Sequence, residues 1–248
     1  TTAEMTRRAD VLKTTLASVD IAICPSEFLL NTYHNRGFSA QQMQFIRQGL
    51  RHIPNWPVQK NPSSKIRVGY IGQLAPHKGV HVLVDAFCRL PDLAEAELTI
   101  YGDPGHFAGY AAQLRAAAAE RLDIHFSGSF DNAQVSQVYR NLDVLVVPSI
   151  WYENSPNTIL EAFAHQTPVI TSNLGGMAEL VAHQKTGLLF TPGSATDLAD
   201  KLSTVLANPA LLAGWRQNIQ PPKSLPQEME ELEQVYRTLG EGVAAYVG

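Results

Sequence analysis

The sequence holds few of the features that would place a chain of 248 residues in a special class. Its only cysteines, Cys24 and Cys88, lie far apart in apolar segments, which favours free buried thiols over a disulfide. No apolar run approaches the roughly 18 residues that a membrane-spanning helix needs, and the N-terminus has no signal-peptide pattern. We therefore expect a cytoplasmic protein, and association with the periphery of a membrane stays open.

The charge pattern and the absent motifs exclude further classes. The net charge is −4 and no run rich in Lys and Arg occurs, so nucleic acid is not expected as a partner. The eight histidines are scattered, and no D-x-D, H-E-x-x-H or C-x-x-C motif occurs, so we expect no metal or other cofactor. The dinucleotide fingerprint G-x-G-x-x-G and the P-loop are also missing, which disfavours a dehydrogenase and a P-loop enzyme.

A regular alternation of short apolar runs and amphipathic stretches begins at residue 66. Strands alternating with helices predict right-handed crossovers and a parallel sheet covered on both faces. The fold class is therefore α/β, with a doubly wound, Rossmann-like sheet over residues 66–220. The predicted strands are 66–71, 97–101, 124–127, 143–147, 169–172 and 187–190, and the helices are 80–90, 109–121, 133–141, 156–165, 177–182 and 196–207.

The flanking segments predict a divided chain. Residues 1–50 read as a partial second α/β unit, the remnant of an N-terminal domain, with a helix at 6–17, strands at 20–24 and 44–47 and a helix opening at Ser26. About 50 residues hold an independent core poorly. Residues 51–65 contain three prolines and resemble a linker. Residues 221–248 carry a helix at 226–239, whose stripe of Met229, Leu232, Val235, Tyr236 and Leu239 covers either the main sheet or the N-terminal unit. The chain starts at Thr1 rather than Met, so we expect an excised fragment.

Two carboxylates bracket the predicted start of the helix at 156–165. Ser155 is a favourable N-cap and Pro156 a favourable first residue, since Pro lacks the N–H that has no acceptor there. Glu153 then lies in the preceding loop and Glu161 within the helix. The free N–H groups of Asn157 and Thr158 form a phosphate seat beside both carboxylates. A ligand with phosphates and hydroxyls, such as a nucleotide sugar, suits this seat.

The position of the seat in the predicted sheet supports a shared site. In a doubly wound sheet, ligands bind at the carboxyl ends of strands one and four. The loop from Gly72 to Gly79, which carries Lys78, follows strand one, and the loop from Ser149 to Pro156 follows strand four. Each feature also has a plainer explanation. The glycines alone allow a tight turn, and Lys78 and Glu153 are ordinary surface charges, whereas Glu161 in a largely buried helix needs a partner.

These motifs resemble those of a known family. Residues 72–79 resemble the G-R-L-x-x-x-K-G loop of retaining glycosyltransferases of family 4, which have the GT-B fold of two Rossmann domains. Residues 153–161 resemble their E-x7-E motif, and similar motifs follow in order at 168–171, 175–176, 179 and 186–189. The resemblance covers about residues 66–207. Residues 20–26 are similar to a segment near the end of the family's N-terminal domain, most of which would be missing from this chain. The terminal helix resembles the helix that crosses back onto that domain.

The resemblance implies a role for each matching residue. Lys78 and the amides of Asn157 and Thr158 would hold the donor diphosphate, Glu161 the ribose, and main-chain groups near Ser129 and Phe130 the base. Glu153 would contact the transferred sugar and stabilise a cation-like transition state. Gln73 replaces the family's Arg and brings no charge to the diphosphate. The expected catalytic residues are Glu153 and Lys78, and the expected donor-binding residues are Gly72, Gln73, Lys78, Ser129, Phe130, Asn154, Ser155, Asn157, Thr158 and Glu161.

The leading hypothesis is a retaining glycosyltransferase of which this chain carries mainly the donor-binding half. Its partners would be a nucleotide-diphosphate sugar and a sugar, lipid-linked or other hydroxyl acceptor, and the missing N-terminal domain would make any contact with a membrane. Two alternatives stay open. The chain is a donor-binding module without turnover by itself, or it is another GT-B-like or Rossmann enzyme, such as an epimerase.

Overall fold

The computed structural model describes residues 2–91 and 95–247. The chain divides into two compact units, which are described separately. The first combines Thr1–Arg51 with Lys223–Gly248, and the second is His52–Pro222. The sequence predicts four segments, and this division into domains stays a prediction. The segments are 1–50, 51–65, 66–220 and 221–248.

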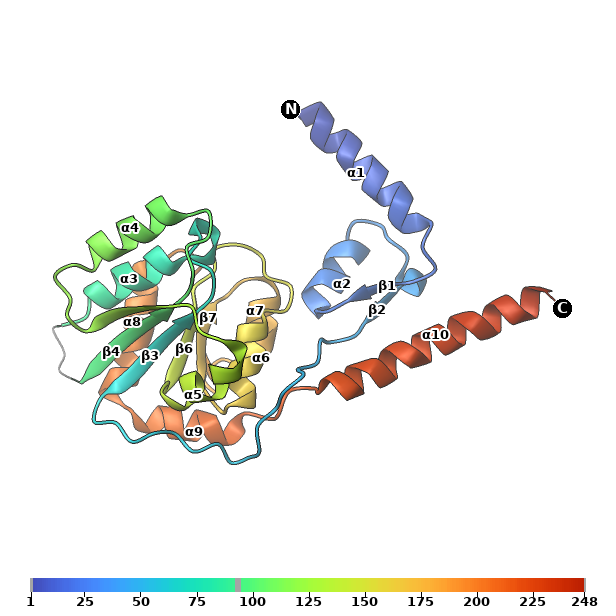
Figure 1. The fold of residues 1–248 in the computed structure, drawn as a ribbon. Helices are drawn as coiled ribbons and strands as arrows, with labels where there is room; N and C mark the ends of the chain where they lie inside the picture. The colour runs from blue at the N-terminus through green and yellow to red at the C-terminus, as the bar shows by residue number, and fades with distance from the viewer. Residues whose placement is uncertain (1, 92–94, 248) are drawn as a thin grey trace. The chain divides into compact units, whose positions relative to one another are not determined.

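The second unit is built on one parallel sheet of six strands in the order β5-β4-β3-β6-β7-β8. The first and fourth strands of the unit, β3 and β6, are therefore neighbours at the centre, and the strand order reverses between them. This order confirms the doubly wound α/β fold (Figure 1). The strands are β3 (Ile66–Ile71), β4 (Ala96–Tyr101), β5 (Ile124–Gly128), β6 (Val144–Val147), β7 (Val169–Ser172) and β8 (Gly187–Phe190).

Helices cover both faces of this sheet because its strands are apolar on both sides. Along β6, Val144 and Val146 join the core under α3, α4 and α8, whereas Leu145 joins the core under α5, α6 and α7 (Figure 1). The alternation follows the two-residue period of a strand. The helices are α3 (Val80–Cys88), α4 (Ala108–Ala117), α5 (Val135–Arg140), α6 (Asn157–Ala164), α7 (Gly175–Leu180), α8 (Ala195–Ala207) and α9 (Ala210–Asn218), with short 3₁₀ turns at Pro76–Lys78 and Asn132–Gln134.

Most predicted bounds in this unit agree with the structure within a few residues, and three differences are informative. The helix expected to run to residue 121 ends at Ala117, because the Arg121 guanidinium pairs with Asp123 and donates to carbonyls at the end of α3. The helix expected at 133–141 begins as a 3₁₀ turn. Helix α9 was not predicted, since only Leu212 and Trp215 on it are buried and its apolar period is too short to recognise.

The first unit holds a small parallel pair, β1 (Ala22–Cys24) and β2 (Met43–Phe45), joined by α2 (Glu27–His34) and a 3₁₀ turn at Ala40–Gln42. This confirms the expected partial α/β unit. Ser26 caps α2 as predicted, and its hydroxyl accepts from the Leu29 N–H at 3.2 Å. The other helices are α1 (Thr2–Ala17), which buries none of its described residues, and α10 (Leu225–Val247).

Helix α10 runs further than the expected 226–239, and its apolar stripe faces the N-terminal unit. Leu232, Val235, Tyr236 and Leu239 line a hollow of about 440 Å³ together with residues 18–21 and 23. The sequence left two partners open for this stripe, and the structure selects the N-terminal unit. Tyr236 still keeps 73% of its surface exposed.

The cysteines are free, as expected. Cys24 is buried, whereas Cys88 at the end of α3 is only partly buried, so the prediction of two buried thiols holds for Cys24 alone. Burial raises the pKa of the Cys24 thiol and also that of Cys88. Both thiols are therefore less acidic than an exposed cysteine, which disfavours reactive roles for them.

The segment predicted to be a linker is fastened to the ends of α5 and α6. The Trp56 indole N–H donates to the Ala164 carbonyl at 2.8 Å, and the Val58 N–H donates to Gln166 Oε1 at 2.7 Å. The ammonium of Lys60 donates to the Tyr139 carbonyl at 2.7 Å. Burial, together with the nearby charge of Arg216, lowers the pKa of Lys60 to about 7, and Asp143 opposes this shift.

The lowered pKa of Lys60 predicts how the free energy of unfolding depends on pH. Between pH 7 and 10 the unfolded chain keeps the Lys60 proton and the folded chain releases it, so the free energy of unfolding rises with pH. Compared with Lys60→Met, the unchanged protein should gain up to about 1 kcal/mol per pH unit in this range. Urea unfolding at pH 7, 8 and 9 measures the difference. Lys185→Met, which changes an exposed lysine of the same unit, is the control. Equal pH dependence in all three proteins would contradict the shift.

Candidate functional site

The loops after β3 and β6 meet at the carboxyl edge of the sheet. The Ile150 N–H donates to the His77 carbonyl at 3.0 Å, and the Ser149 hydroxyl donates to the same carbonyl at 3.0 Å. Gly79 has a φ of +70°, and a Cβ there would lie 2.0 Å from the Pro148 carbonyl oxygen. Only glycine permits this approach. The predicted meeting of the two loops is therefore correct.

A third helix end holds the other side of the β6–α6 loop. The Gly176 N–H, in the first turn of α7, donates to the Glu153 carbonyl at 2.9 Å. A Cβ at Gly176 would lie 1.8 Å from the Asn154 carbonyl oxygen. The backbone of Glu153 is thus fixed by α7 on one side, while Ser149 at the start of the loop is fixed by the β3–α3 loop on the other.

These loops enclose a hollow of about 440 Å³. It lies between the ends of β3 and β6 and the start of α6, which is the position expected for a ligand in this sheet order. Its lining includes seven of the residues predicted from the sequence. The lining residues are Tyr70, Ile71, Gly72, Gln73, Lys78, Val147, Ser149, Glu153, Ser155, Pro156, Asn157 and Thr158.

Lys78 and Glu153 form an ion pair inside this hollow. Lys78 Nζ lies 2.7 Å from Glu153 Oε1, and the Ser149 hydroxyl lies 3.0 Å from the same oxygen. The Glu153 side chain keeps 17% of its surface exposed and that of Lys78 keeps 32%. The resemblance assigned Lys78 to the diphosphate and Glu153 to the transferred sugar, whereas the structure brings their charged atoms into direct contact.

The start of α6 differs from the expected cap. Pro156, with a φ of −67° and a ψ of 115°, is the N-cap residue, and Asn157 is the first helical residue. Ser155 was expected to cap the helix, but its hydroxyl oxygen is buried and has no hydrogen-bond partner among the described residues. A proline cap has no side-chain acceptor for the first turn. The N–H groups of Asn157 and Thr158 consequently stay available at a helix N-terminus, where the helix dipole favours an anion.

Glu161 lies one turn further into α6 and outside the lining of the hollow. Burial raises the pKa of its carboxyl group, and the hydroxyl of Tyr139, 3.5 Å from Oε2, partly opposes that rise. The partly buried carboxylate therefore has the partner that the sequence demanded, and this partner comes from α5.

A second hollow of about 320 Å³ adjoins the first. Ile71, Gly72 and Gln73 line both. The predicted residues Ser129 and Phe130 line the second hollow, where the Phe130 ring meets the edge of the Tyr101 ring at a centroid distance of 5.5 Å. Asn154, like Glu161, is a predicted site residue that lines neither hollow. Its carbonyl packs on Gly176 instead.

Five lining residues of the first hollow were not predicted as site residues: Tyr70, Ile71, Val147, Ser149 and Pro156. Tyr70 is almost wholly buried, and its hydroxyl donates to the Gln73 carbonyl at 2.8 Å, which shapes the turn after β3. Burial raises the pKa of Tyr70 well above its ordinary value, so the hydroxyl keeps its proton. Position was the available signal, because Tyr70 lies at the end of β3 and Ser149 shortly after β6.

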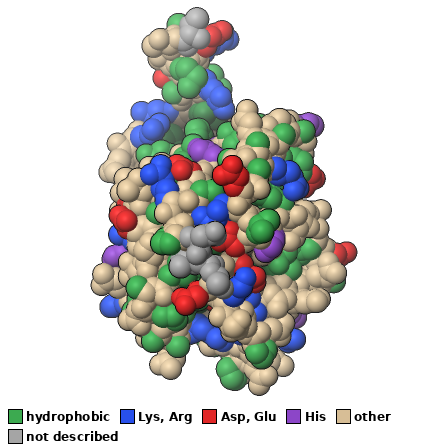
Figure 2. Space-filling model, turned by 90° about the vertical axis from the view of Figure 1, so that its left-hand side faces the viewer, with side chains coloured by type: hydrophobic (Ala, Val, Ile, Leu, Met, Phe, Trp, Pro, Cys, Tyr) green, Lys and Arg blue, Asp and Glu red, His purple; other side chains and the backbone are tan. Residues whose placement is uncertain are grey.

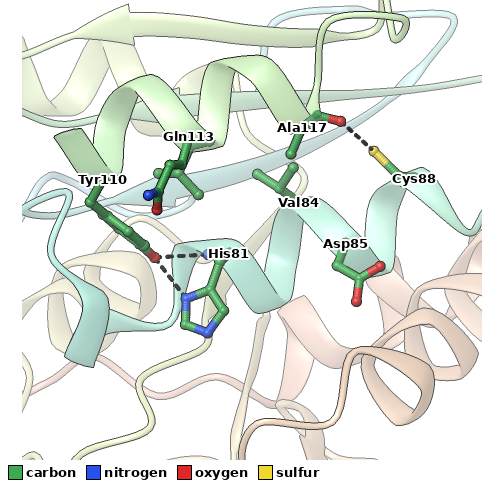
Figure 3. A pocket seen from close by; sticks show the side chains of 8 residues that line it. His81, Val84, Asp85, Cys88, Tyr110, Gln113 and Ala117 are labelled. Carbon is green, nitrogen blue, oxygen red and sulfur yellow. Dashed lines mark hydrogen bonds between the residues drawn. The ribbon is translucent and has the colours of Figure 1, made fainter. Parts of the chain in front are cut away.

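A further hollow of about 310 Å³ lies between α3 and α4 (Figure 3). Two of its polar residues, His81 and Tyr110, bond to each other. The His81 backbone N–H donates to the Tyr110 hydroxyl at 3.0 Å, and His81 Nδ1 lies 2.8 Å from the same oxygen. No Lys or Arg is among its lining residues, so it is less suited to a phosphate than the hollow beside Lys78.

Figure 2 shows a face on which acidic and basic side chains are interspersed.

Comparison with known proteins defines the class. The family model described as "Glycosyl transferases group 1" matches residues 54–220, and the chain belongs to this family. It is 31% identical over 175 residues to the glycogen synthase of Mycobacterium tuberculosis, covering 68% of this chain and 41% of the relative.

Solved structures support the same fold. Sucrose-phosphate synthase from Thermosynechococcus elongatus is 28% identical with a TM-score of 0.79, over 96% of this chain and 62% of that one. Anabaena HepE, solved in complex with UDP and glucose, is 22% identical with a TM-score of 0.75, over 88% of this chain and 63% of that one. The fold is therefore of the GT-B glycosyltransferase type, and the chain spans less than half of the curated relative and under two thirds of each solved chain.

The described residues contain no group of three or more His, Cys, Asp and Glu side chains arranged to hold a metal ion. Within the same residues, no helix combines the length and the apolar character that crossing a membrane requires.

The close approach of Gly79 to the Pro148 carbonyl predicts that replacing Gly79 lowers the free energy of unfolding by an unusually large amount. Gly79→Ala adds a methyl group against the Pro148 carbonyl and forces alanine into a left-handed conformation, so the free energy of unfolding should fall by about 3 kcal/mol or more. Gly193→Ala is the matched control, because Gly193 has a similar φ of +76° and no atom closer than 3.9 Å. It should lose only about 1 kcal/mol. Equal losses in urea unfolding would show that the approach of the loops is not a constraint.

Proposed function

We propose that this chain carries the donor-binding half of a retaining glycosyltransferase of family 4, which transfers a sugar from a nucleoside-diphosphate sugar to a hydroxyl acceptor. One observation carries the proposal. A lysine, a carboxylate and an uncapped helix N-terminus line a single hollow at the switch point of the sheet. Membership of the glycosyltransferase family and the UDP complex of a structural neighbour support it.

The diphosphate binds at the start of α6. The N–H groups of Asn157 and Thr158 point toward it, and the helix dipole adds a partial positive charge. Lys78 supplies the full positive charge. Gln73 donates a hydrogen bond without charge, so stabilisation of the leaving group depends on Lys78 and the helix end.

Binding of the diphosphate changes the partner of Lys78. Its ammonium now contacts Glu153 Oε1 at 2.7 Å and would turn toward the phosphate oxygens. Glu153, whose Oε1 lies 3.0 Å from the Ser149 hydroxyl, is then free to accept hydrogen bonds from the hydroxyl groups of the transferred sugar. Its negative charge also stabilises a cation-like sugar in the transition state.

The transfer step proceeds on one face of the donor sugar. The bond from the anomeric carbon to the diphosphate oxygen breaks, and the acceptor oxygen forms a new bond on the same face, so the configuration is retained. The proton of the acceptor hydroxyl passes to the departing diphosphate oxygen. Lys78 and the start of α6 stabilise the charge on the leaving group, and no metal or other cofactor is required in this proposal.

The remaining residues hold the nucleoside. Glu161 accepts hydrogen bonds from the ribose hydroxyls, and the second hollow, with Ser129 and Phe130, takes the base. Gly72 and Gln73, which line both hollows, lie between the phosphate and the base. The acceptor is a sugar, a lipid-linked group or another hydroxyl compound, and a cytoplasmic location with peripheral membrane contact stays part of the proposal.

A second candidate function is donor binding without turnover by this chain alone. All residues that line the two hollows belong to one unit, residues 52–222. Release of nucleoside diphosphate from UDP-, GDP- and ADP-sugars, with and without simple sugars as acceptors, separates the candidates. Turnover by the chain supports the enzyme, and tight binding without release supports the module.

Glu161 provides the first test of the donor site. One of UDP-, GDP- or ADP-glucose should raise the melting temperature of the protein, and Glu161→Ala should weaken its binding about tenfold or more, since a hydrogen bond to a charged group contributes ~1.5–3 kcal/mol. Glu120→Ala, at an exposed position of the same unit, should bind normally. Unchanged affinity in a folded Glu161→Ala protein would overturn the ribose role.

Lys78 provides a test of the phosphate seat. Lys78→Met should weaken a nucleoside diphosphate at least about tenfold and leave the nucleoside unchanged, because only the diphosphate meets the ammonium. Calorimetric titration with UDP and uridine, or with the nucleotide that the thermal shift selects, measures both affinities. An equal loss for both ligands would mean that Lys78 shapes the hollow rather than binding phosphate.

A further inference from the structure

A buried polar cluster lies behind the start of α6. Tyr139 on α5 is fully buried, and His165 at the end of α6 keeps 1% of its surface exposed. Their rings stack at a centroid distance of 4.8 Å and an angle of 13°. Two polar side chains at this depth need partners, and the partners lie on α5 and α6.

The hydroxyl of Tyr139 stands between the first turn of α6 and the Glu161 carboxylate. It donates to the Thr158 carbonyl at 3.0 Å and lies 3.5 Å from Glu161 Oε2. Burial, followed by the charge of Glu161, raises the pKa of Tyr139, so the hydroxyl keeps its proton as a donor. A single proton therefore serves two acceptors, one on the residue of the phosphate seat and one on the predicted ribose anchor.

His165 holds the Tyr139 ring in place. His165 Nδ1 lies 2.7 Å from the Glu161 carbonyl, and Nε2 lies 3.0 Å from the Ser136 hydroxyl. Burial lowers the pKa of His165, and the bond to the Glu161 carbonyl opposes that shift. A neutral ring with its proton on Nδ1 satisfies both partners, since Nδ1 donates to the carbonyl and Nε2 accepts from Ser136. The ring against which Tyr139 stacks is thus fixed at both nitrogens.

We propose that Tyr139 is a positioning residue for the donor, whose hydroxyl holds the Glu161 carboxylate and the first turn of α6 in one geometry. This inference rests on the proposed function. Glu161 has to present its oxygens to the ribose while Asn157 and Thr158 present their N–H groups to the diphosphate. Because the Tyr139 hydroxyl contacts both the Thr158 carbonyl and the Glu161 carboxylate, it fixes the positions of the phosphate-binding and ribose-binding groups relative to each other.

The Tyr139 proton also favours the charged form of Glu161. Burial raises the pKa of this carboxyl, and a donor at Oε2 opposes the rise. The titratable groups around Glu161 are Tyr139 from α5 and His165, which directly follows α6. Lys60 lies further away, where its ammonium donates to the Tyr139 carbonyl. Without the hydroxyl, Glu161 takes up a proton at higher pH and becomes a poorer acceptor for ribose.

The experiment compares Tyr139→Phe with Tyr110→Phe. Both substitutions remove one hydroxyl and keep the ring. Tyr110 is the matched control because its hydroxyl also bonds to a helix backbone: it accepts from the His81 N–H in the first turn of α3. Tyr110 lies in the separate hollow between α3 and α4 (Figure 3). Affinity for UDP, or for GDP or ADP if these stabilise the unchanged protein better, is measured by calorimetry. We expect a fivefold to twentyfold loss, about 1–2 kcal/mol, in Tyr139→Phe and less than twofold in Tyr110→Phe.

A double-mutant cycle with Glu161→Gln separates positioning from general stability. If Tyr139 acts through Glu161, Tyr139→Phe should cost less than twofold in the Glu161→Gln background. An equal loss in both backgrounds overturns the inference and leaves the donor site itself intact. If no nucleoside diphosphate binds the unchanged protein, the proposed function fails instead.

A ligand-free readout keeps the inference testable in that case as well. Carbon-13 NMR of the glutamate carboxyls follows the titration of Glu161, identified by its loss in Glu161→Gln. Tyr139→Phe should move this titration to higher pH, and Tyr110→Phe should leave it in place. An unmoved titration in a folded Tyr139→Phe protein would show that the hydroxyl does not act on Glu161.

Discussion

The contact between the backbones of the β3–α3 and β6–α6 loops is the constraint on which the site depends. Gly79 lies so close to the Pro148 carbonyl that no side chain fits, and Gly176 approaches Asn154 in the same way from α7. Parallel strands bring these loops to one edge, but only the absence of two Cβ atoms lets them touch. The loop that carries Glu153 is consequently held on both sides, and its side chain can meet Lys78.

The charges of the site are arranged in two layers around α6. On the open side, Lys78 and Glu153 neutralise each other at the mouth of the helix, and the uncapped first turn adds donors. On the buried side, Tyr139 and His165 bond to the backbone and the carboxylate of the same helix. The segment around Lys60 fastens the ends of α5 and α6. The short helix and the loop before it can therefore hold Glu161 and Glu153 in fixed positions, because neighbouring elements satisfy their polar groups.

Much of the fold and of the site was predictable, for reasons that particular residues illustrate. The β6 run was recognisable because every position in it is apolar, as a strand covered on both faces requires. The cap predicted at Ser155 was wrong because residue preferences for caps are weak beside the tertiary contacts that set the loop. Helix α9 was not predicted because its two buried residues are too few to show the apolar periodicity of a helix. The contact of Lys78 with Glu153 joins residues 75 positions apart, and no local pattern encodes it.

The sequence by itself determined the α/β class, the family motifs and most residues of the candidate site. Local periodicity and motif spacing carry that information, because they act over a few residues. Only the tertiary structure decided which of these residues touch. It paired Lys78 with Glu153, made Pro156 the cap of α6 and supplied Tyr139 as the partner of Glu161. Such pairings depend on how distant elements pack, and packing is a property of the whole sheet and its helices rather than of any one segment.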